Sequence, residues 1–178
     1  MNQPAVRGLR VNTNKISIEK FKEIFDQSLK SIPFSSNGFL LESDEKLGNS
    51  PLHLSGAFYL QEPSSMLAVC SSGLEHETRD VKVLDLCAAP GGKTSQIANM
   101  ISSGSLLVSN EIVSSRASVL FSNVERQGFK NVVVTNEKPE NLECFEGFFD
   151  YVFVDAPCSG EGMFRKNPET IDEWSKEN

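Results

Sequence analysis

The chain has 178 residues, of which 39% are hydrophobic and 23% charged, which suits one folded domain, or one domain with a small appendage, and excludes wholesale disorder. Its formal net charge of −7 disfavours a module that only binds nucleic acid, and its four cysteines and two histidines form no zinc-binding pattern, so we expect no metal. With no signal-like start and no apolar run near ~18 residues, we expect a soluble, cytoplasmic protein that does not enter a membrane.

Residues 1–55 are predicted to form a small amino-terminal α/β subdomain. A short strand within residues 8–15 leads into a turn, and a second strand is expected at residues 38–41. Between them Ser17 is the expected N-cap of a helix, and residues 42–55 are expected to be a loop that ends the subdomain. The apolar residues that give this helix its spacing are Ile18, Phe21, Phe25, Leu29 and Ile32.

The charge of the amino-terminal segment differs from that of the rest of the chain. Residues 1–30 hold six Lys/Arg and three Asp/Glu, a balance of +3, which leaves −10 on the other 148 residues. A basic end on an acidic body could guide a polyanion to one edge of the molecule, so we expect Arg7, Arg10 and Lys15 to contact such a polyanion. The alternative is an ordinary solvated surface.

Residues 56–178 are predicted to form the larger domain. A helix enters through Pro63 and closes near Gly73, and after residue 80 apolar runs alternate with amphipathic helices. This alternation indicates a parallel sheet of the Rossmann-like α/β class. The expected strands are 81–86, 105–109, 132–134 and 151–154. The expected helices are 94–101 and one that ends at Gly128 and has Val113, Ala117, Leu120, Phe121 and Val124 on one face.

The stretch VLDLCAAPGGKTSQIA, residues 83–98, joins the first of these strands to the next helix. Its Gly-Lys-Thr resembles the end of a Walker A loop, but the first glycine of that motif would fall at Cys87, and the dinucleotide pattern G-x-G-x-x-G is also absent. What remains is a tight turn of small residues that lets a ligand approach the backbone and the free N–H groups of a helix start. We therefore expect a ligand-binding loop that is not a phosphate loop.

Two acidic residues are expected at the same edge of the sheet. Glu111 ends the second strand, where a carboxylate can accept hydrogen bonds from a ribose diol. Asp155 ends the fourth strand and faces the crevice in which α/β folds bind ligands. An ordinary surface carboxylate is the alternative for each, but their common position favours a binding site.

Three motifs, LQEPSSM, DLCAAPGGKT and DAPCSGEGMFRKNP, together with LRVNT, resemble the Fmu/Sun family of S-adenosylmethionine-dependent RNA 5-methylcytosine methyltransferases. Many bacterial members of that family act on ribosomal RNA. The resemblance implies a Rossmann-like methyltransferase sheet behind a small amino-terminal subdomain, S-adenosyl-L-methionine as cofactor, and RNA as partner.

The resemblance also implies residue roles. Glu111 would hold the ribose, and Asn136 or Glu137, of which Glu137 is favoured, would lie near the adenine. Asp155 would face the amine of the cofactor and the target base, and Lys93, Asp155 and Cys158 are the expected catalytic residues. The methionine part of the cofactor would lie against Cys87, Ala88, Ala89, Pro90, Gly91, Gly92 and Lys93.

The chemistry of the family explains its cysteines. A thiolate that adds to C6 of cytosine makes C5 nucleophilic enough to take the methyl group, and loss of the C5 proton then expels the thiol. In the family a cysteine in a later Thr-Cys motif is the nucleophile, and the cysteine that matches Cys158 helps to release the product. The present sequence has no Thr-Cys pair. Cys70 and Cys144 are expected to be structural.

The sequence is thus expected to correspond to the amino-terminal two-thirds of such an enzyme and to lack the last three strands of the family's seven-stranded sheet. The strand at 151–154 would then have an exposed edge, and self-association through it is expected. Two alternatives remain: a catalytically incomplete fragment that binds cofactor or RNA, and a methyltransferase that modifies amino nitrogens. The tetrapeptide that begins at Asp155, Asp-Ala-Pro-Cys, favours carbon methylation over the latter.

Overall fold

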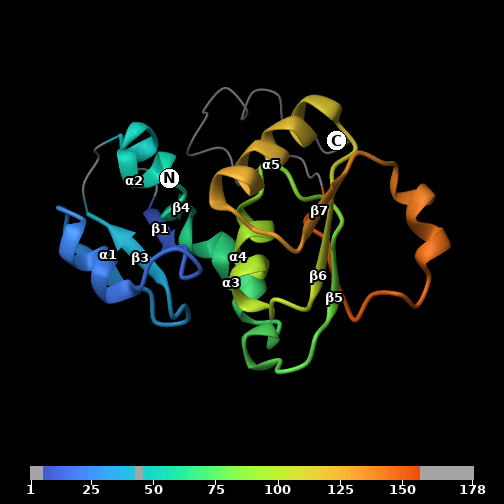
Figure 1. Cartoon of the computed structure of the whole chain (residues 1–178), viewed down its shortest axis with the longest axis horizontal. Coiled ribbons are helices and arrows are strands. Elements are labelled where there is room, and N and C mark those ends of the chain that lie inside the picture. Colours follow the sequence, from blue (N-terminus) through green and yellow to red (C-terminus); the bar gives the residue numbers. More distant parts are fainter. Residues whose placement is uncertain (1–5, 43–45, 157–178) are drawn as a thin grey trace, which may run out of the picture.

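The computed structural model describes residues 6–42 and 46–156. These residues form a small antiparallel sheet near the amino terminus and a parallel sheet in the second half of the chain. In Figure 1 the helices α3 (Pro63–Cys70), α4 (Gly92–Met100) and α5 (Ser114–Gln127) lie between the two sheets. The predicted Rossmann-like α/β architecture with a separate small unit is confirmed.

The small sheet has four antiparallel strands in the order β2-β3-β1-β4. Leu9 of the central strand β1 is paired with Phe39 on one side and Leu60 on the other. The fourth strand of this sheet, β4, lies beyond residue 55 in the sequence. The strands are β1 (Arg7–Val11), β2 (Leu29–Ser31), β3 (Gly38–Leu41) and β4 (Phe58–Leu60).

The predicted helix of this unit is shorter than expected. Helix α1 spans Ile18–Ile24, and the Ser17 hydroxyl accepts a hydrogen bond from the Lys20 N–H, as predicted for an N-cap. Extension of the helix to Ile32 was wrong, because Leu29 begins β2 and gains ladder pairing with Leu41. An apolar residue every three or four positions fits a helix, but it also fits a turn followed by a strand whose alternate residues face one core.

The segment predicted as a loop before residue 55 also contains helical turns. They are the 3-10 turn η1 (Leu47–Asn49) and the one-turn helix α2 (Pro51–Leu54). Ser50 caps α2 and Pro51 occupies its first position, which is the usual arrangement at a helix start.

The rings of Phe21, Phe25 and Phe58 pack together in the core of the small unit, with centroids 5.0–5.9 Å apart. This unit therefore has a closed aromatic core of its own.

The second sheet is fully parallel, with strand order β7-β6-β5-β8. From β5 the chain builds outward in one direction to β6 and β7, and then returns to place β8 on the other side of β5. The carboxyl ends of β5 and β8 therefore form a topological switch point, the usual ligand crevice of an open α/β sheet. The strands are β5 (Lys82–Asp85), β6 (Leu106–Asn110), β7 (Val132–Thr135) and β8 (Tyr151–Phe153).

One face of the parallel sheet packs against the helices. Val83 and Leu107 on that face are fully buried with Ile97 of α4 and with Val69 and Leu74, the latter in the 3-10 turn η2 (Leu74–His76). Gly128 ends α5 in the left-handed conformation, as predicted. The predicted buried face of α5 was wrong at two positions. Val113 precedes the helix and Phe121 points to solvent, and the buried positions are Ala117, Leu120, Val124 and Gln127.

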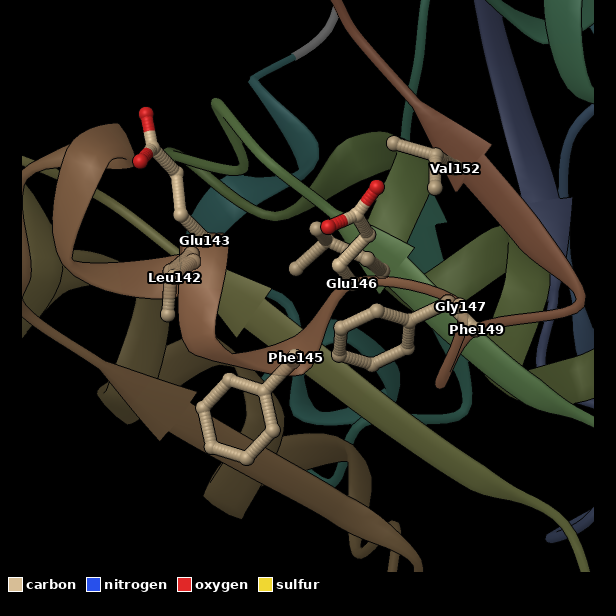
Figure 2. A pocket seen from close by; sticks show the side chains of 8 residues that line it. Leu142, Glu143, Phe145, Glu146, Gly147, Phe149 and Val152 are labelled. Carbon is tan, nitrogen blue, oxygen red and sulfur yellow. The ribbon is translucent and has the colours of Figure 1, made fainter.

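The opposite face is partly open. The 3-10 segment η3 (Pro139–Phe145) and the turn after it form a hollow of about 490 Å³ with Leu84 and Val152. Figure 2 shows the rings of Phe145 and Phe149 beside each other, with Val152 of β8 across from them. In the described part of the chain β8 pairs only with β5, and Val152 and Val154 are 55% and 59% exposed. Among residues 6–42 and 46–156, no strand covers the outer edge of β8, and the prediction of an exposed edge in the whole chain stays a prediction.

Candidate functional site

The loop after β5 is a tight turn. The Gly91 N–H donates to the Ala88 carbonyl at 2.8 Å, and the Ala88 N–H donates to the Asn110 carbonyl of β6 at 2.8 Å. Gly91 has φ = +108°, where an L side chain is strained, and a Cβ there would lie 3.1 Å from Leu120 Cδ1. Only glycine suits this position, which brings the backbone close to α5 and starts α4.

Side chains outside the turn bind three of its carbonyl groups. Arg116 Nη2 donates to the Ala89 carbonyl at 2.9 Å, and Asn123 Nδ2 donates to the Pro90 carbonyl at 2.8 Å, both from α5. Arg10 Nη2 from the small sheet lies 3.4 Å from the Gly92 carbonyl. The loop is therefore held in place by helix α5 on one side and by the small sheet on the other.

A pocket of about 510 Å³ lies at the switch point. Its wall comes from three segments that are distant in the sequence: the end of β4 with the start of α3, the loop after β5, and the residue at the end of β8. The lining residues are Tyr59, Leu60, Gln61, Glu62, Ser65, Asp85, Cys87, Ala88, Ala89, Pro90, Gly92, Lys93 and Asp155. All of the predicted loop residues except Gly91 thus share one pocket with Asp155.

Asp85, which the sequence analysis did not select, has the most unusual environment in this pocket. Its side chain is buried, with the residue 1% exposed; Oδ2 accepts from Thr94 Oγ1 at 2.7 Å, and Oδ1 has no hydrogen-bond partner among the residues that the structure describes. Burial raises the pKa of Asp85 to about 6, although the Thr94 hydrogen bond and the Lys93 charge oppose the rise. A buried acceptor without a donor is unfavourable by itself, so this atom is suited to a donor that arrives with a ligand.

Lys93 and Asp155 form an ion pair at the mouth of the pocket. Lys93 Nζ lies 2.6 Å from Asp155 Oδ2, and their side chains are 19% and 63% exposed. The pair joins the first turn of α4 to the end of β8, so a cation and an anion stand side by side at the switch point. Two of the three predicted catalytic residues are therefore adjacent, and the third, Cys158, lies outside the described residues.

The residues predicted to hold ribose and adenine form a neighbouring group and do not line this pocket. Glu111 is buried; its Oε1 accepts from the Val113 N–H at 3.0 Å, and its Oε2 lies 3.5 Å from Arg116 Nη1. Asn136 Nδ2 donates to the Glu111 carbonyl at 2.6 Å, and the Glu137 N–H donates to Asn110 Oδ1 at 3.0 Å. Arg116 connects this group to the loop, because the same guanidinium binds Ala89 and Glu111.

The described cysteines lack the environment of a nucleophile. Cys87 lines the pocket, where burial raises the pKa of its thiol and the carboxylates of Glu111, Asp85 and Asp155 raise it further. Burial also raises the pKa of Cys70, whose sulfur accepts from Gln96 Nε2 at 3.2 Å. Cys144 is exposed on η3 and bonds only locally, to the Asn141 carbonyl. Cys87 and Cys70 are therefore neutral thiols at pH 7.

The predicted contact with RNA is wrong for Arg10, and for the exposed Lys15 it stays a prediction. Arg10 is 1% exposed and faces the interior, and burial lowers the pKa of its guanidinium to about 9, so that it is still charged at neutral pH. Lys15 Nζ donates to the carbonyls of Ser55 at 2.6 Å and Arg126 at 2.7 Å. Both cations bind the protein itself, which net charge along the sequence could not reveal.

Neither a metal cluster nor a membrane span is found in the described part of the chain. Within residues 6–42 and 46–156, no group of three or more His, Cys, Asp or Glu side chains is arranged to hold a metal ion. Across those same residues, no helix has the length and apolar character needed to cross a membrane.

Comparisons with known proteins identify the family. The family model for 16S rRNA methyltransferase RsmB/F matches residues 72–178, and that for the N-terminal domain of 16S rRNA methyltransferase RsmF matches residues 1–63. Ribosomal RNA small subunit methyltransferase F is 44% identical in Serratia proteamaculans and 41% identical in Vibrio campbellii, each over 184 residues. Both matches cover 98% of this chain and 38% of the relative, a smaller share than the two-thirds expected from the sequence.

The fold comparison agrees with the sequence comparisons. A crystal structure of a methyltransferase homologue from Pyrococcus horikoshii is 28% identical, with a TM-score of 0.80, and the match covers 96% of this chain and 56% of that one. The RsmB/F family model matches more than half of the chain, and a methyltransferase sheet carries the loop and the switch-point pocket. The chain belongs to the RsmB/F family of 16S rRNA methyltransferases.

Proposed function

We propose that this chain provides the S-adenosylmethionine site, and part of the catalytic site, of an enzyme that methylates C5 of cytosine in ribosomal RNA. The observation that carries the proposal is the pocket at the switch point, where the Lys93–Asp155 pair lies close to the unpartnered Oδ1 of Asp85. The names of the curated relatives support ribosomal RNA as the substrate. An RNA substrate of this kind is found in the cytoplasm, which we propose as the location.

The residues present suit the cofactor. The amino-acid end of S-adenosylmethionine carries an ammonium and a carboxylate, and Asp85 Oδ1 is a buried acceptor suited to the ammonium. The N–H groups at the start of α4 suit the carboxylate. Glu111 would accept from the ribose hydroxyls after Arg116 moves aside, and Asn136 and Glu137 would border the adenine. When bound, the cofactor supplies a methyl group on a positively charged sulfur.

Lys93 and Asp155 would orient the target base. A cytosine presents an amino donor at N4 and a carbonyl acceptor at O2, and the pair offers one acceptor and one donor side by side. A base can reach them only if it leaves its stack, which suits a single-stranded or looped RNA. In this role Asp155 accepts from N4 and Lys93 donates to O2, and their mutual ion pair opens when the base enters.

The covalent step requires a thiolate. Its sulfur adds to C6, the electron pair moves to C5, C5 takes the methyl group, and removal of the C5 proton restores the double bond and expels the thiolate. Cys87 does not suit the nucleophile, because burial and then the surrounding carboxylates raise the pKa of its thiol. We assign Cys158 to product release, in keeping with its place in the Asp-Ala-Pro-Cys motif.

A second candidate is favoured by one observation. The sequence contains no Thr-Cys pair, and the chain spans 38% of the length of its curated relatives. The 178 residues alone would then bind cofactor and transfer no methyl group.

We also propose that the small unit ends near residue 60, because β4 completes its sheet, and that the chain self-associates through the open edge of β8.

Titration calorimetry with S-adenosylhomocysteine tests the proposed site. The wild type should bind, and Gly91→Val should lose at least about tenfold in affinity because a β-branched residue at φ = +108° distorts the loop. Gly73→Val is the matched control, because Gly73 also has positive φ (+76°), but a Cβ added there would meet no atom within 4 Å, and the residue does not line the pocket. No heat from the wild type, or equal affinity in Gly91→Val, would refute the site.

A methyl-transfer assay with cytosine-containing RNA tests the second candidate and the assignment of Cys158. We expect no transfer by the 178-residue chain, with or without Cys158→Ser. Transfer by this chain that Cys158→Ser abolishes would make Cys158 the nucleophile and would refute its assignment to product release.

A further inference from the structure

We propose that Arg10, a residue of the small antiparallel sheet, is a positioning residue that fixes the two walls of the pocket relative to each other. The inference rests on the proposed function, because its consequence for binding requires that the pocket take the cofactor. Nothing in the loop motif itself includes Arg10, which precedes that motif by more than seventy positions in the sequence.

The guanidinium of Arg10 bonds to both walls. On the β4 side, Nε donates to Gln61 Oε1 at 3.1 Å, and Gln61 lines the pocket. On the α4 side, Nη2 donates to Ser95 Oγ at 2.6 Å and lies 3.4 Å from the Gly92 carbonyl, while Nη1 donates to Asn99 Oδ1 at 2.7 Å. One rigid planar group thus joins the strand that forms one wall to the first turn of the helix that forms the other.

The two walls of the pocket also contact each other directly, so the distance between them depends on the Arg10 guanidinium. A Cβ added at Gly92 would lie 3.5 Å from Tyr59 Cε1 and 3.7 Å from the Gln61 amide. Gln61 Nε2 in turn donates to Gln96 Oε1 at 3.1 Å, and Gln96 Nε2 donates to the Met66 carbonyl at 2.9 Å. Gln61 is therefore held between Arg10 and α4, and the loss of Arg10 would free one side of it.

The burial of Arg10 calls for an explanation beyond packing. It is 1% exposed, and among the described residues no carboxylate forms an ion pair with it; its partners there are amides, a hydroxyl and a carbonyl. A buried cation without a counter-ion is costly unless its hydrogen bonds are complete. Its positive charge also lies beneath the first turn of α4, where it adds to the potential that attracts the carboxylate of the bound cofactor.

Asn12 provides a matched control in the same interface. It is fully buried, and its Nδ2 donates to the carbonyls of Gly56 and Gln127, each at 3.0 Å, which ties the small unit to the end of α5. Its Oδ1 accepts from Asn99 Nδ2 at 2.9 Å, so it also contacts a partner of Arg10. Asn12 does not line the pocket. Loss of Asn12 removes none of the hydrogen bonds that the Arg10 guanidinium makes, so it should weaken the interface while Arg10 still joins the two walls.

The experiment compares Arg10→Met, Arg10→Lys and Asn12→Ala by amide hydrogen exchange and by calorimetry with S-adenosylhomocysteine, at a temperature where each is folded. We expect Arg10→Met to accelerate exchange in residues 91–95 and to weaken binding by about tenfold, because the walls lose their common tie. Arg10→Lys should lie between it and the wild type, because an ammonium cannot reach both walls. Asn12→Ala should accelerate exchange near residue 127 and change affinity by less than about twofold.

The outcomes are distinguishable. Arg10→Met with unchanged exchange in residues 91–95, or with the affinity of Asn12→Ala, would overturn the proposal, and so would full recovery of affinity by lysine. If the wild type does not bind S-adenosylhomocysteine, the proposed function fails, and the exchange of residues 91–95 alone decides whether Arg10 positions the loop. If Arg10→Met does not fold, Ser95→Ala replaces it, since it removes the Oγ that accepts from Arg10 Nη2 and donates to the Gly92 carbonyl, and keeps the other bonds of the guanidinium.

Discussion

The two sheets of this chain differ in how their apolar residues are covered. The small antiparallel sheet covers a core of its own, in which Phe21 and Phe58 are fully buried. The parallel sheet is packed on one face by α3, α4 and α5, and on the other it exposes Val133 and Val152, of which Val152 lines the hollow of η3. The first unit is thus self-sufficient, and in the second the described residues leave an edge and a face open.

The difference shows where the pocket gets its rigidity. The loop after β5 belongs to the open sheet, but one of its supports, Arg10, comes from the closed one. A closed core with three packed phenylalanines is rigid, so a side chain that extends from it can hold a ligand-binding loop in a fixed position. We therefore expect substitutions in the small unit to weaken ligand binding in the pocket, and substitutions on the open face of the parallel sheet to leave it unchanged.

The largest expected effect is in the closed core. Phe58→Ala should lower the free energy of unfolding by about 3–5 kcal/mol, because it removes a fully buried ring that packs on Phe21 and Phe25. Phe148→Ala, in the open region, should lower it by less than about 1 kcal/mol, because that ring is 38% exposed. Urea unfolding followed by circular dichroism measures both, and equal losses would contradict the distinction between the two regions.

A smaller effect is expected at the open edge. Val152→Lys should weaken self-association by about tenfold, because a charge on an edge strand opposes pairing with a second copy. Val119→Lys is the control, since Val119 has similar exposure but lies on α5, away from the edge. Sedimentation equilibrium gives the association constants. A wild type that stays monomeric at high concentration would refute association through β8.

The sequence predicted the parallel strands well for a physical reason. Near-continuous apolar runs are typical of parallel strands in α/β folds, and the four runs lie at β5, β6, β7 and β8. The turn of small residues and Asp155 were predictable because parallel strands direct their carboxyl ends to one edge. Asp85 could have been selected by the same argument, since it is an acid at the end of an apolar strand.

Other features depend on contacts that no local pattern contains. Whether residues 29–31 continue a helix or form β2 is decided by pairing with β3. The burial of Arg10 depends on Gln61, Ser95 and Asn99, which are 51 to 89 positions away in the sequence. A cation in a basic segment is usually solvated, so composition alone favoured the wrong role for it.

The most direct test of the central claim, that the switch-point pocket binds the cofactor through Asp85, is the pH dependence of affinity for S-adenosylhomocysteine, measured by calorimetry on the wild type and Asp85→Asn. The pKa of Asp85 is raised to about 6, so below that pH a proton competes with the ligand's ammonium for the carboxylate. The wild type should therefore bind about tenfold more tightly at pH 7.5 than at pH 5, whereas Asp85→Asn should bind weakly and equally at both. Equal affinity of the wild type at the two pH values, or tight binding by Asp85→Asn, would contradict the account.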